Sequence, residues 1–88
     1  MEKVIKLIMD ESKTIVISVN DEIQYSILPD NRNINAEDIF KIFDFQMGNK
    51  YRVEKENSKN VDASVIDFFY DLFEEIANRV NQIEDNES

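Results

Sequence analysis

The residues best suited to chemistry in this chain are carboxylates, and they gather in the last third of the sequence. From Asp62 onward there are eight acidic residues and one cation, Arg79, so this segment holds most of the net charge of −9. Two neighbouring carboxylates can perform acid–base catalysis when burial separates their proton affinities. Helical spacing instead places four of them on one polar helix face, where water solvates them. This acidic face consists of Asp67, Asp71, Glu74 and Glu75, and it predicts no catalytic pair.

The other common chemistries lack their residues. The chain has no histidine and no cysteine, which removes the most common general base, the most common metal ligand and the thiol nucleophile. Its single glycine, Gly48, cannot supply a glycine-rich loop for a phosphate group. We therefore expect a protein that is not an enzyme and that has no catalytic residue, no metal site and no cofactor.

One stretch imitates a calcium loop. Asn31, Asn33 and Asn35 have the alternate spacing of EF-hand ligands. The position that requires glycine holds Ala36, however, and the twelfth position holds Ile42 where the motif needs glutamate. A loop followed by a helix cap explains the three asparagines better than a calcium site.

Composition limits the class of protein. With 88 residues, 42% of them hydrophobic and 33% charged, the chain fits one globular domain over residues 1–88. It has neither a signal-peptide pattern nor an apolar run of about 20 residues, so we expect a cytoplasmic protein that does not insert into a membrane. The ten cations are scattered, which argues against direct binding of nucleic acid.

The first 20 residues predict a β-hairpin. Residues 3–9 and 14–19 are apolar and rich in β-branched side chains, and the polar residues 10–13 fit the loop between two strands. Asn20 and Asp21 follow, and both residue types tolerate a positive φ angle, which predicts a tight turn.

A third strand is expected over residues 22–28. Apolar and polar side chains alternate there, which predicts that Ile23, Tyr25 and Ile27 point into the core. Pro29 ends the strand. Three consecutive strands with short turns predict an antiparallel meander.

The second half switches to a helical period. Asn35 is a good helix N-cap, with Asp38 three positions later in a variant of the capping box. The first helix should cover residues 36–47 and end before Gly48, which suits a left-handed C-cap. Residues 50–55 alternate and predict a fourth strand.

The last helix is expected over residues 62–83, followed by a frayed acidic tail at 83–88. The order βββαβα predicts an α+β domain in which two helices pack on one face of an antiparallel sheet of about four strands.

An apolar seam runs along this last helix with alternating spacings of three and four residues, and it consists of Ile66, Phe69, Phe73, Ile76, Val80 and Ile83. A helix over residues 62–83 is about 33 Å long, whereas strands of six or seven residues span about 20–24 Å. About two turns should therefore extend beyond the sheet. The seam is therefore either the domain's own core or, in part, a contact with a second subunit. If the first helix leaves the protruding end uncovered, we expect its residues, Ile76, Val80 and Ile83, to pair with a second copy in a homodimer.

The acidic face allows two interpretations. It is either a solvated surface or a surface that binds another protein with basic character, and Tyr70 at its edge is a further candidate contact. We therefore expect a non-catalytic, acidic interaction module that self-associates through its C-terminal helix. One alternative is a nucleic-acid mimic of the phage or mobile-element type, which blocks the basic groove of a DNA- or RNA-binding protein. The other is a purely structural subunit of an oligomer.

Overall fold

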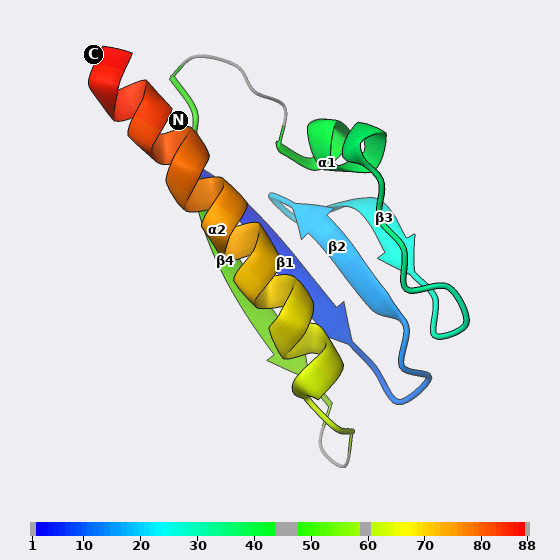
Figure 1. Cartoon of the computed structure of the whole chain (residues 1–88). Coiled ribbons are helices and arrows are strands. Elements are labelled where there is room, and N and C mark those ends of the chain that lie inside the picture. The colour runs from blue at the N-terminus through cyan, green and yellow to red at the C-terminus, as the bar shows by residue number, and fades with distance from the viewer. Residues whose placement is uncertain (1, 44–47, 59–60, 88) are drawn as a thin grey trace.

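The computed structural model describes residues 2–43, 48–58 and 61–87, and of residues 84–87 it describes the backbone alone. These residues form a small α+β domain with a four-stranded mixed sheet and two helices, in the predicted order (Figure 1). The elements are β1 (Glu2–Met9), β2 (Ile15–Val19), β3 (Glu22–Ile27), α1 (Ala36–Phe43), β4 (Lys50–Asn57) and α2 (Ser64–Glu87).

The sheet is mixed, so the prediction of a purely antiparallel sheet was wrong. Its strand order is β3-β2-β1-β4. β1 pairs antiparallel with β2 and β2 with β3, as the predicted meander requires. β4 runs parallel to β1, with Val53 opposite Ile5. The connection explains this: α1 lies between β3 and β4 and lets the chain return along the sheet, so β4 runs in the same direction as β3 and β1 (Figure 1).

The core lies on one face of the sheet, and both helices cover that face. Alternate residues of β1, such as Leu7, are fully buried there. The ring of Phe43, at the end of α1, lies 5.3 Å from the ring of Tyr51 in β4 and 6.0 Å from that of Phe73 in α2. The two helices therefore meet on the same side, α2 mainly over β4 and α1 beside β3.

β3 departs from the predicted alternation at Ile23. Tyr25 and Ile27 pack with the core, as predicted. Ile23 is 71% exposed, so its predicted place in the core was wrong. Ile23 pairs with Ser18 of β2, and Tyr25 pairs with Ile17, the residue before Ser18. Gln24, which lies between Ile23 and Tyr25, is therefore an extra residue without a pairing partner in β2. Such a β-bulge changes the face of the sheet to which side chains point on its two sides. Tyr25 and Ile27, after the bulge, point to the core, and Ile23, before it, points to the face opposite the helices.

The short-range sequence signals are confirmed. Asn20 and Asp21 have φ angles of 50° and 70°, as a tight hairpin turn with two left-handed residues requires. At the start of α1, Asn35 Oδ1 accepts the N–H of Asp38 at 2.9 Å, while the Asp38 carboxylate accepts the N–H of Asn35 at 3.5 Å. This is the predicted capping box.

The first helix begins at Ala36, as predicted. The described part of α1 ends at Phe43, and the predicted continuation over residues 44–47 lies outside the described residues. Gly48 has a φ of 89°, the left-handed conformation expected for it.

α2 contains 24 residues and continues to Glu87 instead of ending at residue 83. It is therefore about 36 Å long, against about 26 Å for the eight residues of β4. Its last turns project past the sheet (Figure 1), which contributes to molecular dimensions of 44 × 23 × 20 Å. Neither helix, in the part of the chain described, is long and apolar enough to cross a membrane.

Candidate interaction surfaces on helix α2

The start of α2 is fixed by a side-chain cap. Asp62 Oδ1 accepts the N–H of Ser64 at 2.9 Å, and this hydrogen bond is the main reason that the pKa of Asp62 is lowered. From this start, one side of the helix enters the core. The buried residues of that side are Ile66, Phe69, Phe73 and Ala77.

The predicted acidic face lies next to β4, and cations of the same chain neutralise part of it. The Lys55 ammonium of β4 lies 2.6 Å from Asp67 Oδ1 and 4.6 Å from the centre of the Tyr70 ring. Arg79 lies 3.2 Å from Glu75 Oε1, one helical turn away. Two of the four predicted carboxylates are therefore engaged in ion pairs within the chain.

The other two carboxylates, Asp71 and Glu74, form no ion pair with any residue that the structure describes. Both line a shallow hollow on the outer side of α2, together with Glu75 and three polar or basic neighbours, Asn78, Arg79 and Gln82. The negative potential of the predicted surface is thus concentrated at Asp71 and Glu74.

Tyr70 lies at the edge of the acidic face, beside Glu74. A hydrogen bond between its hydroxyl and Glu74 is the largest of the causes that raise its pKa, followed by burial and by the negative charges of Glu74 and Asp71. The ring is partly buried between the helix and Lys55. Tyr70 therefore has one side in the molecule and its polar end among the carboxylates.

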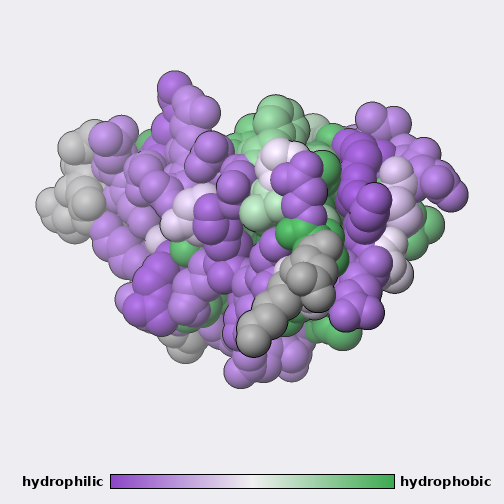
Figure 2. All heavy atoms as spheres, turned by 90° about the horizontal axis from the view of Figure 1, so that it is seen from below, coloured by the Kyte–Doolittle hydropathy of each residue, from purple (hydrophilic) through white to green (hydrophobic). Residues whose placement is uncertain are grey.

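An exposed apolar flank lies on the opposite side of α2. We define it as Phe68, Leu72, Ile76 and Ile83, which fall within about 80° of arc on a helix with 100° per residue. Phe68 is 65% exposed and Ile83 is 60% exposed, while Leu72 and Ile76 are partly buried. Figure 2, which views the molecule from the end at which α2 begins, shows hydrophobic surface between two hydrophilic areas.

The predicted self-association residues divide between core and surface. Ile76 and Val80 pack against the protein's own core, although partly exposed, and Ile83 remains open to solvent. Phe68 was not among the predicted contacts. The signal that could have indicated it is the apolar arc of about 200°, which is wider than one sheet face can bury.

A side chain that the sequence did not single out fastens α2 to β4. Asn81 Oδ1 accepts the N–H of Tyr51, and Asn81 Nδ2 donates to the carbonyl of Tyr51, both at 2.9 Å. This contact sets the position of the second half of α2 on the sheet.

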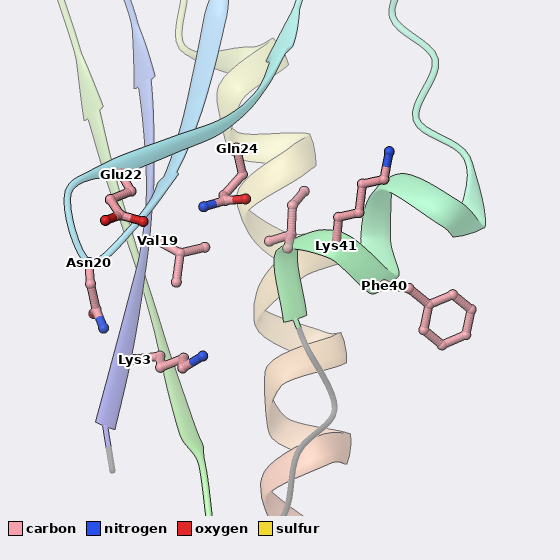
Figure 3. A pocket seen from close by; sticks show the side chains of 8 residues that line it. Lys3, Val19, Asn20, Glu22, Gln24, Phe40 and Lys41 are labelled. Atoms are coloured by element: carbon pink, nitrogen blue, oxygen red, sulfur yellow. The ribbon is translucent and has the colours of Figure 1, made fainter.

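A separate depression lies between α1 and the turn that joins β2 to β3 (Figure 3). Lys3, Glu22 and Gln24 line it from the strands and Lys41 lines it from α1, while Phe40 points away from the other labelled side chains. Its charges are mixed and its mouth is open, so no particular ligand chemistry is favoured.

Among the side chains that the structure describes, those of residues 2–43, 48–58 and 61–83, no three acidic groups lie together as a metal site requires. No protein-family model, curated protein or solved structure matches this chain.

Proposed function

We propose that this protein is a non-catalytic interaction module that associates with a second copy of itself through the apolar flank of α2. The observation that carries this proposal is the exposure of Phe68 and Ile83, at 65% and 60%, on one side of the same helix. Burial of a phenylalanine or isoleucine side chain stabilises an interface by about 1.5–3 kcal/mol when the burial is complete. A cytoplasmic location is part of the proposal.

The charge distribution supports the apolar flank over the acidic face as the main contact. Lys55 and Arg79 already neutralise Asp67 and Glu75, so a basic partner would meet a weaker field than the sequence suggests. The second candidate, a nucleic-acid mimic that binds a basic groove, is supported by the carboxylates of Asp71 and Glu74, which have no ion pair among the described residues. The remaining alternative is a purely structural subunit, which forms this dimer and binds no other protein.

The experiment is light scattering after size exclusion, over a hundredfold range of concentration. We expect the wild-type protein to change from monomer to dimer, and we expect Ile83→Asp to remain monomeric because the dimer would bury an unpaired charge. The matched control is Ile23→Asp, the same substitution at an isoleucine that is 71% exposed on the uncovered face of the sheet.

The control variant should dimerise like the wild type. A wild-type protein that is monomeric at every concentration contradicts the proposed function. Equal loss of dimer in both variants contradicts the assignment of the contact to α2.

A further inference from the structure

The two most exposed apolar side chains of α2 lie at matching distances from the middle of the helix. Phe68 and Ile83 are 15 residues apart, which corresponds to about 22 Å along the axis and about 60° around it. The midpoint falls between Glu75 and Ile76. A second α2 that runs antiparallel across this midpoint brings each Phe68 to the level of the partner's Ile83.

We propose that the occupant of the apolar flank is a second copy of this chain, with its α2 antiparallel and the two-fold axis between Glu75 and Ile76. This inference rests on the proposed function and specifies the geometry of its dimer. Each end of the contact then joins one Phe68 to one Ile83, so both exposed side chains are covered in one symmetric arrangement.

The charges of α2 support the antiparallel direction. Arg79, whose side chain is 75% exposed, lies about 5 Å along the axis from the midpoint. Asp71 lies about 7 Å from it in the other direction. Antiparallel pairing therefore brings Arg79 nearly level with the partner's Asp71, on the same side of the helix pair. This places a cation against a carboxylate that has no ion pair with the described residues of its own chain.

The neighbours of this ion pair also fit. The aliphatic part of Arg79 lies level with the partner's Leu72, which widens the apolar contact. The two Glu75 carboxylates come close to the axis, and each retains its own Arg79 at 3.2 Å. A parallel pair would instead place the two Arg79 side chains side by side, together with the two Asp71 carboxylates.

The test exchanges the charges between chains. Arg79→Glu alone sets two carboxylates against each other at both symmetric positions, and Asp71→Arg alone sets two cations against each other. We expect each variant to dimerise at least about tenfold more weakly than the wild type in about 0.1 M NaCl. Mixed in equal amounts, they restore both ion pairs in a mixed dimer, which native mass spectrometry and light scattering detect at within about threefold of wild-type affinity.

The matched control is Glu74→Arg, which changes the net charge as Asp71→Arg does but lies beside Tyr70, outside the contact. It should dimerise alone and should not restore dimerisation when mixed with Arg79→Glu. A single chain with both exchanges, Asp71→Arg and Arg79→Glu, should dimerise like the wild type. Circular dichroism verifies that each variant is folded.

The outcomes separate this inference from the function on which it rests. If the wild-type protein dimerises but a mixture of Arg79→Glu and Asp71→Arg does not, the antiparallel arrangement is overturned and self-association stands. The same conclusion follows if Glu74→Arg restores dimerisation of Arg79→Glu. A wild-type protein that stays monomeric overturns both.

Discussion

At the scale of single residues, the Asn81 side chain forms two hydrogen bonds with the backbone of β4 that a neighbouring strand would otherwise form. A residue in a strand directs its N–H and its carbonyl to the same side, and at Tyr51 this side is the free edge of β4. The Asn81 amide is bonded to both groups at 2.9 Å. It therefore occupies a position at which another chain could add a strand, which is a known route to aggregation.

We expect Asn81→Ala to lower the free energy of unfolding by about 1–3 kcal/mol, because it leaves the backbone groups of Tyr51 without these two partners. Asn78→Ala, on the exposed side of the same helix, is the control and should change stability by less than about 0.5 kcal/mol. Urea denaturation followed by circular dichroism measures both. Equal losses in the two variants would show that the amide pair does not stabilise the protein.

At the scale of residues, the sequence predicted local contacts and missed distant ones. The capping box between Asn35 and Asp38 follows from a spacing of three residues. Asn81 and Tyr51 are 30 residues apart, and no local pattern distinguishes Asn81 from other polar residues of the helix. The ion pair of Lys55 with Asp67 was unpredictable for the same reason, since it depends on where α2 crosses β4.

At the scale of elements, the strands and helices were predictable but the bulge in β3 was not. Alternation placed Tyr25 and Ile27 correctly because a regular strand turns every second side chain to the same side. Gln24 interrupts that rule, and nothing in its residue type marks it as an extra residue. The position of Ile23 is decided by pairing with β2 and not by the sequence of β3.

The start of α2 gives a pH dependence whose sign follows from Asp62. The hydrogen bond from Ser64 lowers the pKa of this carboxyl in the folded protein below the value of 3.8 that it has when free. Its contribution to stability is therefore present above about pH 4, the pKa range of an unfolded aspartate, and is lost as the pH falls through the folded pKa.

We expect Asp62→Ala to lower the melting temperature by a few degrees at about pH 6, because the helix loses its cap, and by much less at about pH 2. The control is Asp30→Ala in the exposed loop after β3, which should have little effect at either pH. Thermal unfolding followed by circular dichroism gives both differences. A loss for Asp62→Ala that is the same at both pH values would contradict the role of its charge.

At the scale of the whole molecule, the sequence did not predict the direction of β4, which runs parallel to β1. Tyr51 and Val53 alternate with charged residues, and this pattern is the same for a parallel and an antiparallel strand at the edge of a sheet. The choice depends on where the chain re-enters the sheet after α1. The charge of the molecule, in contrast, follows directly from composition and has consequences for association.

Salt distinguishes the two proposed functions by the sign of its effect. Each molecule carries a net charge of −9, most of it on the segment that contains α2, so dimerisation through α2 brings two acidic helices together. Raising NaCl from about 0.05 M to about 0.5 M shortens the distance over which they repel from more than 10 Å to a few ångströms. The repulsion acts between charges spread over both helices, at distances that salt screens strongly, whereas Arg79 and the partner's Asp71 attract at contact distance, where salt screens less, so the loss of repulsion is the larger effect of salt. We therefore expect the dimer to become several-fold tighter in high salt, as measured by light scattering, with Ile83→Asp monomeric throughout as the control.

A nucleic-acid mimic bound to a basic groove behaves in the opposite way, because the same salt screens the attraction that holds it. Dissociation of the dimer in high salt would contradict association through the apolar flank, and capture of a basic protein at low salt that is lost at high salt would support the mimic.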